Sequence, residues 1–216
     1  MIRALVFDFD GLILDTESAL IGAYEDQHAL HGLPFDRARF LESVGHADYA
    51  FDPWHAFEKR ADRAALEAER RKRNRELELL LPILPGVTTL LEAGRAAGLR
   101  LGVASNSRHP HVEGHLQRLG LRGYFEFFAC REDVPSPKPE PDVYRLVLGH
   151  FGLRGHEAIA FEDSQTGILA ATRAGMHTVA VPGPSTVHHD FAQATMRVAS
   201  LADVALPDLL ARLGSK

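Results

Sequence analysis

The chain has 216 residues, which is enough for one large domain or for a domain that carries an insertion. Its 45% hydrophobic and 25% charged residues are ordinary for a globular protein and exclude a disordered, collagen-like or coiled-coil chain. The formal net charge of -5 gives no indication of a nucleic-acid partner or of binding to an anionic membrane.

The cellular setting can be predicted from what the sequence lacks. The one cysteine, Cys130, excludes a disulfide within the chain and is compatible with a reducing interior; we expect it to be a small buried hydrophobe. The apolar start ends at Asp8, too early for a secretory signal, and no run approaches the roughly 20 apolar residues that span a bilayer. We therefore expect a soluble cytoplasmic protein with no membrane partner.

Short apolar runs alternate with helical patterns along most of the chain. Buried strands are predicted at residues 4–7, 99–104, 125–129, 158–161 and 177–181. Helices are predicted at residues 88–97, 111–119, 141–151 and 165–174. A glycine stands where each helix should end in a left-handed cap: Gly98, Gly120, Gly152 and Gly175. This alternation predicts an α/β fold, a doubly wound Rossmann-like parallel sheet with helices on both faces.

The stretch at residues 18–81 breaks the rhythm, because it has no strand-like run and is rich in Ala, Leu, Glu and Arg. Residues 58–81 are predicted to form one long helix, after which Pro82 and Gly86 mark the return to the sheet. We predict an α/β core at residues 1–15 and 83–216 and an inserted helical cap at residues 16–82. The cap should cover the carboxyl edge of the sheet, where ligands bind in such folds.

Polar residues follow the predicted strands. Asp8 and Asp10 come just after the first strand, where burying two carboxylates is costly unless a cation or hydrogen bonds compensate. Taken alone, they are more simply explained as solvated acids in a loop at the strand end.

Three more polar groups stand in comparable positions. Ser105 and Asn106 suit an anionic oxygen, or a helix cap. Lys138 lies among three prolines that would hold it stiffly, or it is an ordinary surface lysine. Glu162 and Asp163 have the oxygen ligands that Mg²⁺ prefers.

The order of these motifs resembles the haloacid dehalogenase superfamily. The resemblance rests on DFDGLILDTE at residues 8–17, SN at 105–106, KPEP at 138–141 and FEDSQTGI at 161–168. The chain is most similar to the β-phosphoglucomutase-like phosphatases with a helical cap. The resemblance covers nearly the whole chain, although the cap matches only in kind.

The resemblance implies roles for the two aspartates and a metal. Asp8 would attack phosphorus and form an aspartyl-phosphate, and Asp10 would protonate the leaving alcohol and then activate water. Mg²⁺ would lie between the Asp8 carboxylate, the Asp10 backbone carbonyl and the Asp163 carboxylate. Glu162 would assist directly or through water.

It also implies how phosphate is held. Ser105 and the backbone N–H of Asn106 would hold phosphate oxygens, and Lys138 would screen the charge between Asp8 and the phosphate.

Within this superfamily the residues favour phosphate-ester hydrolysis. Asp10 and the metal-ligand acids argue against carbon–halogen chemistry. The mutases of this group carry a cap histidine and a cap-loop arginine; here Leu20 stands at the histidine position, and residues 44–49, including His46, have no arginine. We expect hydrolysis of a small phosphorylated metabolite such as a sugar phosphate, by a monomer, with a phosphosugar mutase as the alternative.

A non-catalytic binding protein is a further alternative. Its best support is the basic run at residues 70–75, but glutamates flank the run and no aromatic residues interleave, so no nucleic-acid partner is expected. His109, His111 and His115 have a metal-like spacing, yet no acid or cysteine close in the sequence completes a zinc site, and surface positions are expected. The aromatic residues of the cap could line a pocket or fill the cap core: Phe51, Trp54 and Phe57.

Overall fold

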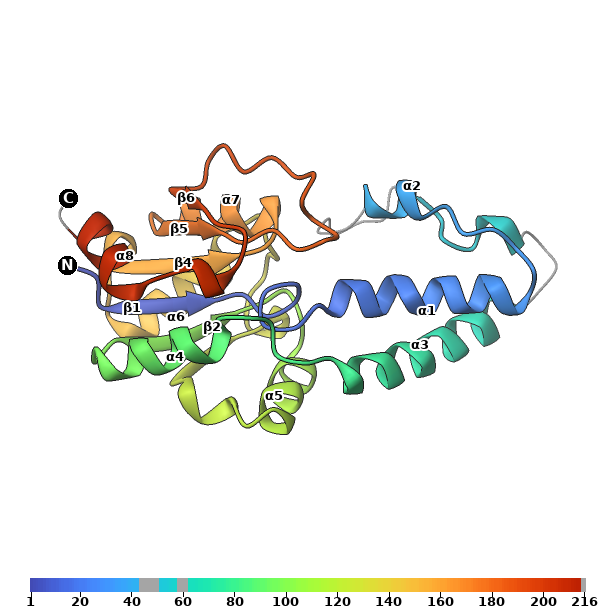
Figure 1. Cartoon of the computed structure of the whole chain (residues 1–216), viewed down its shortest axis with the longest axis horizontal. Coiled ribbons are helices and arrows are strands. Elements are labelled where there is room, and N and C mark those ends of the chain that lie inside the picture. The colour runs from blue at the N-terminus through green and yellow to red at the C-terminus, as the bar shows by residue number, and fades with distance from the viewer. Residues whose placement is uncertain (43–50, 58–61, 215–216) are drawn as a thin grey trace.

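The structure is a computed structural model of the chain, and it describes residues 1–42, 51–57 and 62–214. The molecule is elongated, with an α/β core that holds both termini at one end and a helical segment that projects from the other (Figure 1). This arrangement confirms the predicted α/β fold with a helical insertion early in the chain.

The core is built on one parallel sheet. Among the described residues its strand order is β3-β2-β1-β4-β5-β6. The strands are β1 (Ala4–Phe7), β2 (Arg100–Ala104), β3 (Phe127–Ala129), β4 (Ala158–Glu162), β5 (His177–Ala180) and β6 (Met196–Arg197). The first five confirm the prediction, whereas β6 was not predicted because two residues carry no periodic pattern.

The side chains of β1 alternate between the two faces of the sheet. Leu5 and Phe7 join one apolar cluster, Ala4 and Val6 join the other, and all four are fully buried. The ring of Phe7 stacks on that of Phe161 with centroids 5.0 Å apart. A strand buried on both faces explains the continuous apolar run in the sequence.

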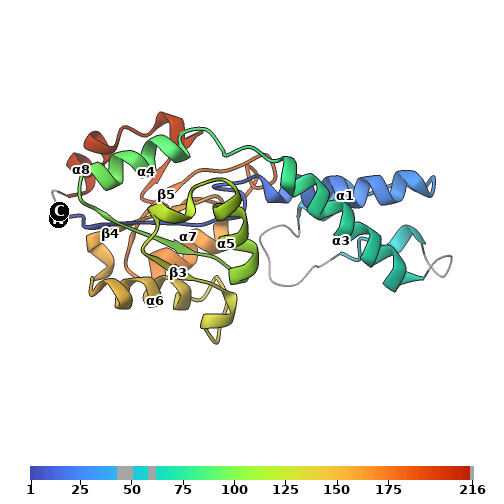
Figure 2. The same cartoon turned by 90° about the horizontal axis from the view of Figure 1, so that it is seen from below.

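Helices cover both faces, as predicted. The helices α4 (Val87–Ala96), α5 (His109–Arg118) and α8 (Leu206–Leu213) pack on the Phe7 face. The helices α6 (Asp142–Phe151) and α7 (Gln165–Arg173) pack on the opposite face, and Figure 2 shows the two layers edge-on. Short 3₁₀ turns complete the described elements: His55–Phe57, Arg122–Tyr124, Arg131–Asp133, Gly155–Glu157 and Leu201–Asp203.

The glycines predicted as helix stops all have a positive φ. Their φ angles are 71° at Gly98, 71° at Gly120, 62° at Gly152 and 79° at Gly175. The four helices end one or two residues before these glycines because the chain turns there.

The inserted segment contains α1 (Thr16–Leu30), α2 (Arg37–Leu41) and α3 (Arg63–Leu80), of which α1 and α3 pack side by side. The predicted helix at residues 58–81 was wrong at its start. Asp62 is extended, and its carboxylate accepts a hydrogen bond from the Ala64 N–H, so the helix begins at Arg63. Residues 58–61 and the predicted cap loop with His46 lie outside the described residues.

The cap has its own small core. Trp54 and Phe57 are buried against Tyr24 and Phe40, and Phe51 packs against the same cluster. Of the two alternatives for Phe51, Trp54 and Phe57, a pocket lining or the cap core, the structure favours the cap core.

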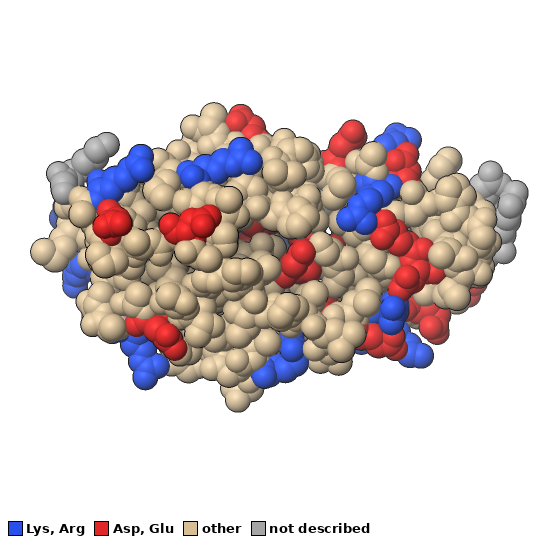
Figure 3. Space-filling model, in the orientation of Figure 1, with Lys and Arg blue, Asp and Glu red and all other residues tan. Residues whose placement is uncertain are grey.

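The basic run on α3 is engaged within the cap. The Arg70 guanidinium lies over the Tyr24 ring and pairs with Glu67, and Arg73 pairs with Asp26 across to α1. On the face drawn in Figure 3, positive and negative side chains are interspersed. Among the described residues, no helix has the length and apolar character needed to cross a bilayer.

The stacked Phe7–Phe161 pair should dominate the stability of the core. We expect Phe7→Ala to lower the free energy of unfolding by about 3–5 kcal/mol, because it leaves a cavity in the centre of the sheet. Leu80→Ala, at a position that is 79% exposed, is the control and should change it by less than about 0.5 kcal/mol. Urea denaturation measures both, and equal effects would contradict this account of the core.

Candidate active site

The carboxyl ends of β1, β2 and β4 bring polar residues from distant segments together. Phe7 pairs in register with Val103 on one side and with Phe161 on the other. Asp8 therefore lies level with Ala104 and Glu162, the last residues of β2 and β4. The strand order reverses direction at β1, which is where doubly wound sheets bind their ligands.

Lys138 lies at the centre of this edge and is 4% exposed. Its Nζ donates to Asp8 Oδ1 at 2.7 Å, to Glu162 Oε1 at 2.6 Å and to the Ala104 carbonyl at 2.8 Å. The two carboxylates raise the lysine pKa further above its usual range, against the opposing effect of burial. The alternative of a surface lysine is therefore wrong.

Glu162 is fully buried and is one of the partners that fix Lys138. It also accepts hydrogen bonds from Tyr144 Oη and Ser164 Oγ. A Cβ at Gly167 would come within 2.0 Å of the Glu162 carboxyl carbon, so glycine is required for this close approach. Glu162 thus fixes the Lys138 side chain without lining the cavity, whereas Asp8 and Asp163 do line it.

Burial and neighbouring negative charge oppose the ionisation of two acids that line the cavity, Asp8 and Asp163. Burial first, and then the charge of Glu162, raise the pKa of Asp8 to about 8 although Lys138 lowers it. Burial and the charge of Asp8 likewise hold the pKa of Asp163 well above its usual range. Gly11 packs on Asp163 so closely that a Cβ there would lie 2.2 Å from Oδ2, and its φ is +76°. With Asp8, Glu162 and Asp163 all ionised, the negative charge at this edge would exceed what the lysine balances.

Asp10 has the opposite environment. Burial alone would raise its pKa, but hydrogen bonds from His111, Ser107 and Thr16 outweigh burial and lower the pKa to about 2. Thr16 Oγ1 donates to Oδ1 at 2.8 Å, and Ser107 Oγ donates to Oδ2 at 2.6 Å. Two carboxylates only two residues apart therefore have pKa values shifted in opposite directions, because hydrogen bonds offset burial at Asp10 and not at Asp8.

The predicted phosphate-binding residues lie at the same edge. Ser105 is buried, and its Oγ accepts a hydrogen bond from the Ser107 N–H at 2.9 Å. The Asn106 side chain clamps the lysine loop: its Oδ1 accepts from the Lys138 N–H at 2.8 Å, and its Nδ2 donates to the Lys138 carbonyl at 3.3 Å. The two segments are thereby joined beside Asp8.

A cavity of about 400 Å³ opens above these groups, between core and cap. The core contributes Asp8, Asp10, Ser105, Asn106, Lys138 and Asp163 to its lining. The cap contributes Glu17, Leu20, Phe40, Asn74 and Glu78. The core side of the cavity is polar, and the cap side carries both polar and apolar side chains. Such a cavity suits a small ligand with an anionic end.

Sequence reasoning missed several residues of this site. Thr16 stands inside the first motif and Ser107 directly follows the second, but neither received a role. The expectation that His111 and His115 lie on the surface was wrong: His111 lines the cavity, and His115 is 8% exposed. Glu78 comes from the cap to meet them, and Cys130 with Asp133 meets His109, contacts that no local spacing reveals. Cys130 itself is a buried core residue, as predicted.

Comparison with known proteins decides the family. The family described as haloacid dehalogenase-like hydrolase matches residues 2–175. The chain belongs to this family. It is 36% identical over 220 residues to "Putative phosphatase YhcW" of Bacillus subtilis, covering 100% of both chains. It is 31% identical to hexitol phosphatase B of Escherichia coli K12, covering 97% of each. This haloacid dehalogenase-like protein is therefore a phosphatase, a phosphoric monoester hydrolase.

Solved structures share the whole fold. The structure of CbbY from Rhodobacter sphaeroides with xylulose-(1,5)bisphosphate has a TM-score of 0.73 at 29% identity, and 95% of this chain and 97% of that one are covered. A β-phosphoglucomutase from Clostridium difficile has a TM-score of 0.71 at 22% identity, covering 99% and 98%, and shows the fold alone.

The buried lysine should be essential to the stability of the site. We expect Lys138→Met to destabilise the metal-free protein by about 3–5 kcal/mol, because it leaves carboxylates buried without their counter-charge. Lys72→Met, on the exposed side of α3, is the matched control and should be nearly neutral. Chemical denaturation in a chelator measures both. An unchanged midpoint for Lys138→Met would show that the ion pairs contribute little.

Proposed function

We propose that the protein hydrolyses the phosphate ester of a small phosphorylated sugar or related metabolite, with Mg²⁺, through an aspartyl-phosphate on Asp8. The observation that carries the proposal is the buried lysine, which fixes one oxygen of Asp8 while Asp10 lies two residues away under the same cavity. We further propose that residues 1–15 and 83–216 form the catalytic core and residues 16–82 the cap.

Asp8 would act as the nucleophile. Lys138 holds Oδ1, so the other carboxylate oxygen is directed to the phosphorus. The new bond forms between this oxygen and phosphorus as the bond from phosphorus to the leaving oxygen breaks. The electron pair goes to the leaving oxygen, which takes a proton from Asp10.

The second half of the reaction regenerates the enzyme. Water attacks phosphorus, Asp10 accepts its proton, and the bond to Asp8 breaks to release inorganic phosphate. Ser105 Oγ, the Asn106 N–H and Lys138 would hold the phosphoryl oxygens as negative charge moves onto them.

The donor set fits a hard divalent cation. Asp8, Glu162 and Asp163 place carboxylate oxygens within 4.8 Å of one another, and all three residues are buried. When all are ionised, three carboxylates against one lysine leave two negative charges, which one divalent cation balances. Asp8 and Asp163, with the Asp10 backbone carbonyl, would hold Mg²⁺, and Glu162 would support them through Lys138. When bound, the ion supplies positive charge beside the phosphoryl oxygens.

A sugar phosphate is supported by the cavity and by the relatives. The cap wall presents Glu17, Asn74 and Glu78, which are acceptors for hydroxyl groups, while Leu20 and Phe40 offer apolar surface. The names of the relatives include a hexitol phosphatase and a phosphorylated-carbohydrate phosphatase, the latter 28% identical over 181 residues.

Phosphosugar mutase is the competing function. It shares the fold, but a mutase must hold its phosphorylated intermediate and delay water. Leu20, an apolar residue, lines the cavity at the position where the mutases of this group carry a histidine. Hydrolysis is therefore the activity that these residues favour.

The function is tested by phosphate release from a panel of sugar phosphates, nucleotides and p-nitrophenyl phosphate, with and without Mg²⁺. We expect Mg²⁺-dependent release that falls more than about 10³-fold in Asp8→Asn, because the nucleophile is lost. Asp203→Asn, at an exposed position of the core, should retain full activity. Isomer conversion of β-glucose-1-phosphate without net phosphate release would establish the mutase instead.

Metal binding should depend on pH through Asp8. Its pKa of about 8 in the fold exceeds its ordinary value of 3.8, so the folded state binds more protons between these values. The stability of the metal-free protein therefore declines as pH rises through that window. Mg²⁺ should accordingly raise the melting temperature more at about pH 9 than at about pH 6. Differential scanning fluorimetry measures the shift, and a larger shift at the lower pH would contradict the assignment.

A further inference from the structure

The cap side of the cavity carries acids without a cation of its own. Glu17 and Glu78 are its acidic residues, and no lysine or arginine of the cap is among the described residues that line the cavity. The basic residues of the described lining, His111 and Lys138, both belong to the core, where each already contacts an aspartate. A second anionic group on a ligand would therefore meet acids at the cap.

The Glu78 side chain is held by donors at both of its oxygens. Asn74 Nδ2 donates to Oε1 at 2.7 Å, and His115 Nε2 lies 3.4 Å from Oε2. An Arg118 Nη donates to His115 Nδ1 at 3.2 Å, which places the proton of a neutral ring on Nε2 and directs it to Glu78. As oriented, these partners present N–H groups to the carboxyl group, so the geometry favours its charged form.

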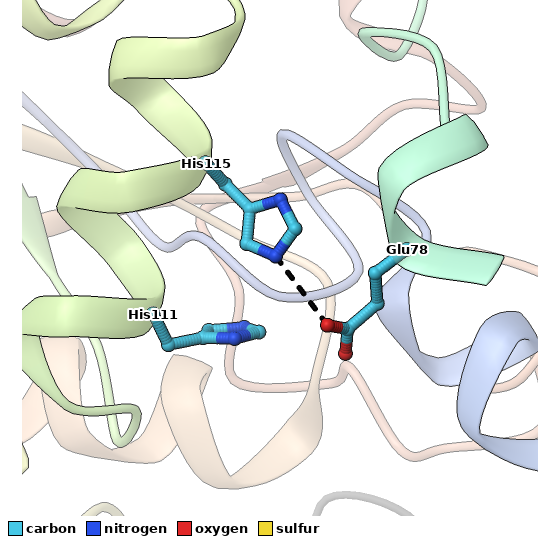
Figure 4. Close-up of side chains that lie close together, drawn as sticks. All are labelled: Glu78, His111 and His115. Carbon is cyan, nitrogen blue, oxygen red and sulfur yellow. Dashed lines mark ion pairs between the residues drawn. The ribbon is translucent and has the colours of Figure 1, made fainter. Parts of the chain in front are cut away.

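Glu78 faces the region that the leaving group would occupy. His111 and His115 lie one turn apart on α5, and Glu78 lies opposite them on α3 (Figure 4). The three side chains bring nitrogen and carboxylate oxygen atoms within 4.8 Å of one another. His111 also reaches Asp10, the proposed proton donor to the leaving oxygen. Glu78 is only 7% exposed although it lines the cavity, so water screens its charge weakly.

Asn74 adds an acceptor beside this carboxylate. Its Nδ2 is engaged by Glu78, which fixes the orientation of the amide and leaves Oδ1 as the remaining polar atom. Oδ1 is buried and has no hydrogen-bond partner among the described residues. A ligand hydroxyl can donate to such an atom, whereas an ionised carboxylate has no proton to donate. Asn74 and Glu78 therefore both require donors from a ligand.

We propose that Glu78, held by Asn74 and His115, selects substrates whose remainder beyond the phosphate ester is uncharged and bears hydroxyl groups, and rejects substrates with a second anionic group. The inference rests on the proposed function, because a phosphate ester bound at the core directs its remainder to the cap. A hydroxyl group donates to this wall, whereas a carboxylate or a second phosphate is repelled by it at low dielectric. The substrate class is then the monophosphates of polyols and sugars, without sugar bisphosphates or phosphorylated acids.

The test measures the binding of matched competitors at a fixed concentration of free Mg²⁺. Glycerol 3-phosphate is compared with 3-phosphoglycerate, and fructose 6-phosphate with fructose 1,6-bisphosphate, so the second member of each pair adds an anionic group to the same carbon skeleton. The reporter is the ester outside these pairs that the wild-type protein hydrolyses fastest, and its alcohol product is quantified. We expect the inhibition constant Ki of the anionic member to be at least about 30-fold higher in each pair.

Glu78→Gln removes the charge and keeps an acceptor in place. We expect it to lower Ki about 10-fold for the anionic members, because the repulsion is lost. It should raise Ki about 3-fold for the uncharged members, because an amide oxygen accepts a weaker hydrogen bond than a carboxylate. A general folding defect cannot move the two constants in opposite directions. Glu69→Gln, at an exposed position of α3, makes the same change in net charge and should leave the ratio unaltered.

Equal Ki values within the pairs for the wild-type protein, or an unchanged ratio in Glu78→Gln, would overturn the proposal. A shift of the ratio in Glu69→Gln as large as that in Glu78→Gln would also overturn it, because selection would then follow overall charge. A wild-type protein that releases phosphate from no ester of the panel with Mg²⁺ would instead overturn the proposed function itself. The failures are thereby distinguishable.

Discussion

The buried ammonium group of Lys138 is the interaction on which the site depends. It lies within hydrogen-bonding distance of Asp8, Glu162 and the Ala104 carbonyl, so it connects the ends of β1, β2 and β4. Removing such charges from water costs several kcal/mol for each ion, and one lysine does not balance three acids. When all three acids are ionised, the remaining negative charge would repel an anionic phosphate ester. A divalent cation would remove that repulsion. The stability of the fold and the proposed chemistry would therefore both benefit from a divalent cation beside these carboxylates.

The sheet and the cap make different contributions to the site. The parallel sheet holds the reacting groups rigidly because its strands are buried on both faces. The cap supplies one wall of the cavity. It joins the core through two linkers that touch where the Leu84 N–H donates to the Ile13 carbonyl at 3.0 Å. Arg118 caps the last carbonyls of α3 from the core helix α5. The cap is therefore anchored to the core next to His111 and Asp10. The contact between cap and core thus lies beside the carboxyl group proposed for the acid–base chemistry.

The core could be predicted from sequence because its signals are local. Apolar runs mark the strands, glycines mark the helix ends, and the polar residues that follow the strands must meet at one edge of a parallel sheet. The site residues contributed by packing could not be predicted. Nothing in the spacing of His111 and His115 indicates that Glu78, more than thirty residues earlier, meets them, because that contact depends on how the cap docks. Asp62 shows the same limit locally, since one capping carboxylate moved the start of a helix that composition alone would extend.

The central claim is that Asp8 carries the phosphoryl group between substrate and water. The most direct measurement is to quench the enzyme in acid during turnover with Mg²⁺, reduce it with borohydride, and sequence its peptides by mass spectrometry. An aspartyl-phosphate is reduced to homoserine, so the account predicts homoserine at position 8 and none in a sample without substrate. Steady turnover with an unmodified Asp8, or with the label on another residue, would contradict it.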